Sequence, residues 1–157
     1  MKTVLICVGN IRESSLKTLA EQFSSRIGHF MPFEDVSVAD VSANKKMTPV
    51  QRCQKEGEQI LSKIGAGDFV VLFDEKGREF TSREFAEFIE KKSLELNRNL
   101  VFVIGGPYGF SDAVYDRCDA KMSLSRMTFT HEMARVIALE QLYRAMTILR
   151  GLPYHHD

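Results

Sequence analysis

Three groups of residues in this sequence are suited to chemistry. Cys7 is followed closely by Arg12, a pairing in which a thiolate could attack an anionic ester held by the guanidinium. The glycine-rich run 105–109 (GGPYG) allows the main chain to approach a ligand closely. His131 and His155 can each exchange a proton near neutral pH. These groups indicate two competing sites, a cysteine nucleophile and a ligand-binding pocket.

The segment 7–14 (CVGNIRES) resembles the phosphate loop of low-molecular-weight tyrosine phosphatases. In that family five residues separate the nucleophilic cysteine from the arginine, whereas four residues separate Cys7 from Arg12 here. Glu13 stands where the arginine is expected, and its carboxylate would repel a phosphate. The ring of amides around the anion would also be one short. The sequence therefore favours the alternative in which Cys7 is a small apolar residue of a buried strand.

Composition limits the protein class. The chain has 157 residues, enough for one domain, and its 44% hydrophobic and 27% charged residues exclude a disordered or fibrous protein. The 21 basic residues equal the 21 acidic ones, which excludes a uniformly basic nucleic-acid coat but permits a local cationic patch. The three cysteines lack metal-ligand spacing and predict reduced thiols. Without a bilayer-spanning run or a signal peptide, we expect a cytoplasmic protein.

Alternating apolar patterns predict strands and helices in turn. The expected strands are 2–8, 33–38, 68–73, 100–104 and 121–124, and the expected helices are 16–27, 49–64, one that begins after residue 81, 111–117 and 131–149. Thr48 with Gln51, and Thr81 with Glu84, form capping boxes at two helix starts. The segment 74–77 is expected to be an exit loop. The alternation predicts an α/β fold with a mainly parallel sheet and helices on both faces.

Five motifs spread along the chain carry a second resemblance. They are KEGEQ at 55–59, IGGPYG at 104–109, MTFTH at 127–131, EQLYRA at 140–145 and YH at 154–155. Together they resemble the RlmH (YbeA) family of SPOUT-class methyltransferases, which act on 23S ribosomal RNA, and the resemblance covers nearly the whole chain. The sequence departs from that family at Thr130, where proline is frequent, and at Asp157, an acidic last residue.

The resemblance implies an α/β knot, the SPOUT fold with a deep C-terminal trefoil knot, in one domain over residues 1–157. It also implies S-adenosylmethionine as cofactor, bound beyond the carboxyl ends of the strands where exit loops meet. The implied cofactor residues are Leu72, Gly105, Gly106, Leu124, Ser125, Arg126, Met127, Thr128 and Phe129. No metal is expected. Because chains generally avoid knots, the knot is expected from the resemblance alone.

The implied reaction is methylation of ring nitrogen 3 of a pseudouridine in 23S ribosomal RNA, on the large subunit or the assembled ribosome. The N3 proton must leave, so a nearby base or acceptor would help. The catalytic candidates are His155 in the tail, His131 at the start of the last helix, and Arg135 within it. His131 could equally be a helix-start residue whose ring caps or packs.

Binding to RNA is expected from arginines in exit loops and along the last helix. The expected residues are Arg12, Arg126, Arg135, Arg144, Arg150 and Tyr154. Arginine forks suit phosphates and splayed bases, although each could instead form a surface or interface ion pair. The resemblance also implies a homodimer that completes the substrate site. Apolar residues on several sides of the last helix suit an interface, or a helix doubly buried within a monomer.

Two other functions stay open on the sequence alone. A phosphatase is disfavoured by the short segment between Cys7 and Arg12. A non-catalytic RNA-binding module on the ribosome would carry the same arginines but would not bind the cofactor.

Overall fold

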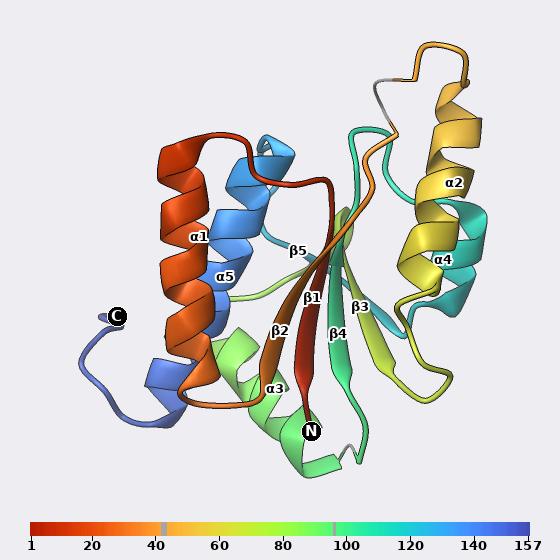
Figure 1. Cartoon of the computed structure of the whole chain (residues 1–157). Helices are drawn as coiled ribbons and strands as arrows, with labels where there is room; N and C mark the ends of the chain where they lie inside the picture. The colour runs from red at the N-terminus through yellow and green to blue at the C-terminus, as the bar shows by residue number, and fades with distance from the viewer. Residues whose placement is uncertain (42–43, 96) are drawn as a thin grey trace.

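The structure, a computed structural model, describes residues 1–41, 44–95 and 97–157. In these residues five parallel strands form one sheet in the order β2-β1-β4-β3-β5, with helices on both faces (Figure 1). The strands are β1 (Thr3–Val8), β2 (Phe33–Val38), β3 (Phe69–Glu79), β4 (Leu100–Ile104) and β5 (Ala120–Ser123). The helices are α1 (Ser14–Gly28), α2 (Pro49–Leu61), α3 (Ser82–Glu95), α4 (Asp112–Arg117) and α5 (His131–Leu149). The predicted α/β architecture is confirmed.

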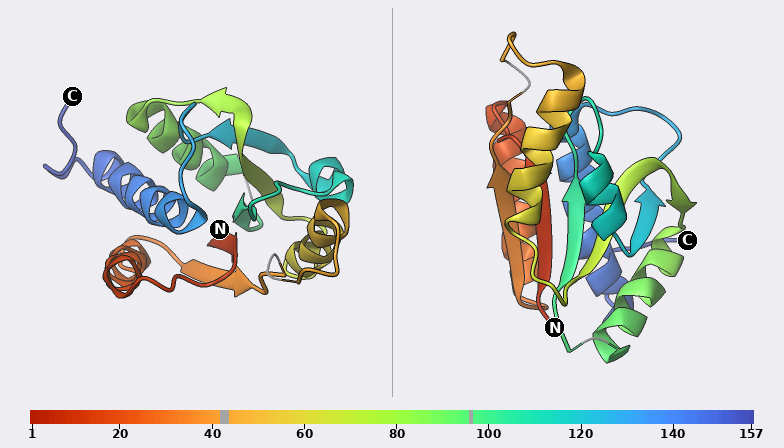
Figure 2. Two further views of the ribbon diagram at one scale, coloured as in Figure 1. Left: turned by 90° about the horizontal axis from the view of Figure 1, so that it is seen from above. Right: turned by 90° about the vertical axis from the view of Figure 1, so that its right-hand side faces the viewer.

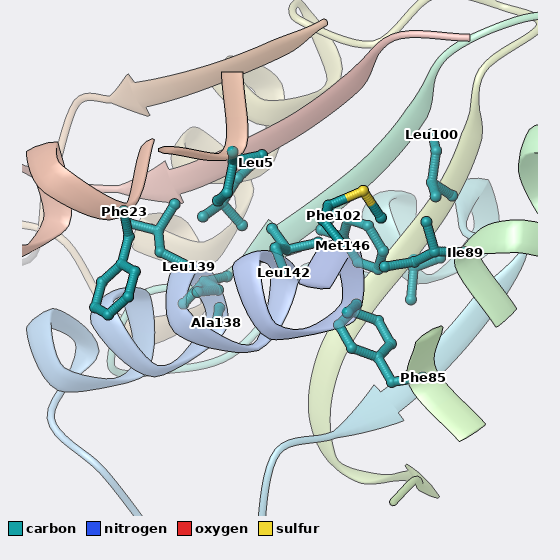
Figure 3. Packing of buried hydrophobic residues seen from close by; sticks show 14 of the residues in the cluster. Leu5, Phe23, Phe85, Ile89, Leu100, Phe102, Ala138, Leu139, Leu142 and Met146 are labelled. Carbon is teal, nitrogen blue, oxygen red and sulfur yellow. The ribbon is translucent and has the colours of Figure 1, made fainter. Parts of the chain in front are cut away.

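Helices on both faces of the sheet bury two apolar cores. On one face α1, α3 and α5 pack over Leu5 and Phe102, and Figure 3 shows Leu142 of α5 beside them. On the other face α2 and α4 cover Ile6 and Val103. Because successive residues of a strand point to opposite faces, neighbours in β1 and β4 are divided between the two cores. Burial on both faces explains why these strands are continuous apolar runs.

Helix α5 lies between α1 and α3, as Figure 2 shows, and packs against both. Leu139 and Leu142 are fully buried there, and Met146 is nearly so. Most apolar side chains of α5 are therefore buried within a single chain. Met133, at the start of the helix, is the exception because 38% of its surface stays exposed.

Strand β3 is longer than predicted. The segment 74–77, predicted to be an exit loop, belongs to the strand. Both Phe73 and Arg78 pair with Met122 of β5, so the residues between them bulge outward and the strand returns to the same partner. Gly77 permits this return, since a Cβ atom there would lie 2.6 Å from the main-chain nitrogen of Met122.

The predicted helix starts are also present. The Thr48 hydroxyl accepts from the Gln51 amide at 3.2 Å, and the Thr81 amide donates to Glu84 at 2.7 Å. Both capping boxes are complete. Thr130, which departs from the family pattern, caps α5 through its own hydroxyl. A hydroxyl cap therefore stabilises the helix start at the edge where ligands are expected.

Candidate active site

A cavity of about 910 Å³ opens beyond the carboxyl ends of β3, β4 and β5. Its walls are the bulge of β3, the glycine-rich run 105–109, the segment 123–130 and the first turn of α5. Parallel α/β sheets bind ligands at this edge, and the volume lies within the range of small-molecule sites. The cavity is therefore large enough for a nucleoside-sized ligand.

Seven of the nine predicted cofactor residues line this cavity. They are Gly105, Gly106, Leu124, Ser125, Met127, Thr128 and Phe129. Leu72 is fully buried in the core beneath, so only its main chain could reach a ligand. Arg126 lines a neighbouring hollow, and its largely exposed guanidinium pairs with Glu79 at 3.3 Å.

The glycine-rich run closes tightly over the core. A Cβ atom on Gly105 would lie 3.0 Å from the ring of Phe110, and one on Gly106 would lie 2.7 Å from the carboxylate of Glu56. Gly109 has a φ of 77°, a conformation that favours glycine.

Glu56 lies beneath this run and is 1% exposed, and burial, followed by the charge of Asp40, raises its pKa. A buried glutamate below the ligand loop is not predictable from its type, because glutamate is rarely buried.

A tyrosine and a carboxylate meet on another wall of the cavity. The Tyr115 hydroxyl donates to Oδ2 of Asp74 at 2.5 Å. Burial and this hydrogen bond raise the pKa of Tyr115 to about 12. Burial opposes ionisation of Asp74, but the bonds from Tyr115 and the Lys76 amide, with the charge of Lys121, outweigh it and lower its pKa. No sequence motif marked either residue.

The loop after β1 is fastened to the start of α5. Oε1 of Glu132 accepts hydrogen bonds from the main-chain nitrogens of Arg12 at 2.6 Å and Glu13 at 3.1 Å. These bonds from the Glu13 and Arg12 amides lower the pKa of Glu132. Glu132 and His131 both line the cavity, so the exposed side chain of Arg12 is held beside it.

Arg135 is buried and bonded within its own chain. Its Nη2 lies 2.7 Å from Oδ1 of Asp35, and its Nη1 donates to Oγ of Ser37 at 2.9 Å and to the carbonyl of Gly9 at 3.1 Å. The residue is 8% exposed. Its guanidinium ties α5 to β2 and to the loop after β1. The roles of Arg135 in RNA binding and catalysis stay predictions.

The predicted tail residues form a separate cluster near the end of α5. Oε1 of Glu140 accepts from Nη2 of Arg144 at 2.5 Å and from the Tyr154 hydroxyl at 3.0 Å. Nδ1 of His155 lies 3.2 Å from Nη1 of Arg144. His131 lies thirteen residues before Arg144 on the helix, a rise of roughly 20 Å. The structure therefore does not bring the two predicted catalytic histidines together within one chain.

The last arginine and the last residue contact other elements. Nη2 of Arg150 donates to the carbonyl of Phe30 at 3.2 Å. Asp157 forms two hydrogen bonds of 2.6 Å with Arg83 of α3 and lies 3.3 Å from Nε2 of His155. The acidic last residue thus holds the tail against its own chain.

Cys7 is a buried residue of β1. It is 3% exposed, and burial raises the pKa of its thiol to about 12 despite the nearby charge of Arg135. A thiol in this state is protonated at neutral pH and is a poor nucleophile. The interpretation of Cys7 as an apolar core residue is confirmed, and the phosphatase alternative loses its nucleophile.

We expect Cys7 to resist alkylation. In native protein at pH 8, iodoacetamide should modify the partly exposed Cys53 and Cys118 at least about tenfold faster than Cys7, because only accessible thiolates react. Peptide mass spectrometry over time measures the three rates, and protein in urea, where all three should react, is the control. Rapid modification of native Cys7 that phosphate slows would restore the phosphatase interpretation.

The described residues contain neither a metal-binding cluster nor a membrane-spanning helix. In 1–41, 44–95 and 97–157, no three or more His, Cys, Asp or Glu side chains are placed to hold a metal ion. Across the same ranges, no helix is long and apolar enough to cross a membrane.

Comparisons with known proteins agree with the fold and extend over the whole chain. The family model described as "Predicted SPOUT methyltransferase" matches residues 1–155. A Bacteroides fragilis protein named ribosomal RNA large subunit methyltransferase H is 49% identical over 157 residues, all of both chains. A Cytophaga hutchinsonii protein of the same name is 45% identical over 99% of this chain and 100% of its own.

A solved structure supports the architecture. A Legionella pneumophila protein assigned as a methyltransferase, in complex with the bound cofactor SAM, aligns with a TM-score of 0.51 at 13% identity. The alignment covers 90% of this chain and 65% of that protein. At this identity the likeness concerns the fold alone.

Proposed function

The chain belongs to the SPOUT methyltransferase family, and from this premise we propose that it transfers a methyl group from S-adenosylmethionine to ring nitrogen 3 of a pseudouridine in 23S ribosomal RNA. The name shared by relatives of between 45% and 49% identity supports the RNA substrate. The substrate is the large subunit or the assembled ribosome, which places the protein in the cytoplasm. The whole chain acts as one methyltransferase domain.

The observation that carries this proposal is the cavity. Segments far apart in sequence, 74–76, 105–109 and 123–130, converge there. Glycines at Gly105 and Gly106 leave room for main-chain atoms to face a ligand, while Leu124 and Ile104 supply apolar walls suited to an adenine ring. These residues fit the cofactor in size and in chemistry.

The chain's own residues orient the RNA base and manage its proton. When bound, S-adenosylmethionine supplies a methyl group that its sulfonium makes electrophilic. The cavity walls hold the base in line and exclude water. The N3 proton must leave, and His131 accepts it in this proposal, which its place in the cavity lining at the start of α5 supports.

RNA is held by arginines around this edge. Arg12 is presented beside the cavity by the Glu132 contacts, and Arg126 lies on the adjoining loop with a largely exposed guanidinium. Arg150, Arg144 and Tyr154 lie at the opposite end of α5. Because they lie far from the cavity in one chain, they act at the target base only if a second copy contributes them.

We therefore propose a homodimer in which the C-terminal tail of one copy reaches the cavity of the other. An exposed apolar surface supports an interface at the cavity edge: Met127 is 78% exposed, and Phe129 and Met133 are partly exposed beside it. In this arrangement His155 of one copy and His131 of the other serve one site.

Mixing two inactive variants tests this shared site. His131→Ala and His155→Ala should each lose activity, but a mixed dimer keeps one site with both histidines, so about a quarter of wild-type activity should return. Each variant alone is the control. Sedimentation verifies the dimer. If the mixture stays inactive although mixed dimers form, the two histidines do not act across the interface.

The methyl transfer itself is tested with purified protein. Ribosomes from cells that lack the enzyme, incubated with tritium-labelled S-adenosylmethionine, should gain label at N3 of a 23S pseudouridine, located by mass spectrometry of the RNA. Ribosomes that already carry the methyl group are the control. Binding of the cofactor without methyl transfer to any RNA would contradict the proposal. No cofactor binding at all would favour a non-catalytic RNA-binding module.

A further inference from the structure

Two polar side chains face the cavity from elements outside the glycine-rich loop. Asp74 lies in the bulge of β3 and Tyr115 in α4, and both line the cavity. Besides the bond of 2.5 Å from Tyr115, the main-chain nitrogen of Lys76 donates to the other carboxylate oxygen of Asp74 at 2.8 Å. Each carboxylate oxygen accepts more than one bond, so Asp74 keeps acceptor capacity. Its carboxylate is held in one orientation.

The negative charge of Asp74 acts more strongly on a ligand in the cavity than that of the next residue, Glu75. Asp74 is half-buried, whereas the next residue, Glu75, is exposed to solvent. A charge partly removed from water acts on a ligand through a lower effective dielectric constant than an exposed one. Lys121, whose amine lies 5.7 Å from the ring centroid of Tyr115, carries a positive charge that favours the ionised form of Asp74.

We propose that Asp74 is a specificity-determining residue that distinguishes the charged methyl donor from its demethylated product, by attraction to the positive sulfonium. This rests on the proposed function. Methyl transfer breaks the carbon–sulfur bond, leaves its electron pair on sulfur, forms the new carbon–nitrogen bond and releases the N3 proton. The sulfur of the product is neutral, so the attraction ends with the reaction. The carboxylate that favours donor binding thereby favours product release.

Tyr115 is a positioning residue in this arrangement. Its hydroxyl fixes the carboxylate, while its ring packs edge-on against Phe110 at 5.7 Å between centroids. The bond between Asp74 and Tyr115 could instead serve only as a brace between β3 and α4. A brace affects every ligand of the cavity alike, whereas recognition of the sulfonium affects only ligands that carry a charge at that position.

Calorimetry with three ligands separates these roles. S-adenosylmethionine and sinefungin carry a positive charge at or beside the sulfur position, and S-adenosylhomocysteine does not. Asp74→Asn should weaken binding of the two charged ligands about tenfold and that of the neutral ligand less than about twofold. Asp74→Glu, which keeps the negative charge, should weaken binding of the charged ligands less than Asp74→Asn does. Asp116→Asn, the matched control at an exposed carboxylate of α4 outside the cavity lining, should change all three by less than about twofold.

Tyr115→Phe gives a second measurement should Asp74→Asn fold poorly. It should weaken binding of the charged ligands by about threefold relative to the neutral one, because the carboxylate loses one fixed bond. Equal changes for all three ligands, in either variant, would overturn the proposal in favour of a brace. Failure of the wild-type protein to bind any of them would instead contradict the proposed function, which keeps the two conclusions distinguishable.

Discussion

Arg135→Met should lower the free energy of unfolding by about 3 kcal/mol, because removing one partner of a buried ion pair leaves the other charge uncompensated. Asp35 is the stranded partner, since its side chain is only 19% exposed and pairs with Arg135 at 2.7 Å. Ser37 and the carbonyl of Gly9 lose a donor at the same time. Urea unfolding followed by circular dichroism measures the change.

Two further variants give this measurement its controls. Arg126→Met removes an exposed arginine that also has an ion pair, and should change stability by less than about 0.5 kcal/mol. Adding Asp35→Asn to Arg135→Met should recover part of the lost stability, because the unpaired charge is gone. A stable Arg135→Met protein that binds cofactor but not RNA would contradict the structural role and support the prediction that Arg135 contacts RNA.

The example of Arg135 shows which features sequence patterns can predict. An arginine in a helix is usually exposed, so a pattern of residue types indicates RNA binding. The partners that Arg135 has in the structure lie on β2 and in the loop after β1, about a hundred or more positions away. Periodicity reports which side of an element is apolar, not which distant side chain it meets. The same limit applies to Glu132 and its contacts with the amides of Arg12 and Glu13.

Local signals predicted the elements and part of the cavity. Apolar runs located the strands. The spacing of Thr48 from Gln51 and of Thr81 from Glu84 located the starts of α2 and α3. Both signals depend on neighbours within a few residues. The motif at 104–109 identified the glycine-rich wall. The extension of β3 was missed because its polar residues 74–76 read as a loop, and its partner in β5 lies more than forty positions later. The knot stays a prediction from the family.

The bulge of β3 connects the fold to the proposed chemistry. It brings Asp74 to the cavity wall, and its return to β5 depends on the missing side chain of Gly77. The extension of β3 therefore determines the position of this cavity wall. A variant that disturbs the return should alter both stability and cofactor binding.

Gly77→Ala should lose about 2 to 3 kcal/mol of stability, with a fall in melting temperature of roughly 5 to 10 °C, since overpacking against rigid structure is costly. The added Cβ would lie 2.6 Å from the main-chain nitrogen and 2.7 Å from the carbonyl carbon of two successive β5 residues, Met122 and Lys121. Main chain in a sheet cannot yield as a flexible side chain can, so β3 must move away from β5.

That movement also displaces the cavity wall at Asp74, so affinity for S-adenosylmethionine should fall at least about tenfold, a loss that calorimetry below the melting temperature measures. Gly28→Ala is the matched control, because a Cβ at the end of α1 meets nothing within 4 Å and alanine is the better helix residue. It should leave cofactor binding unchanged and stability equal or slightly higher. Wild-type stability and binding in Gly77→Ala would mean that β3 does not need its close return to β5, and the cavity wall would have to be positioned by α4 through Tyr115 alone.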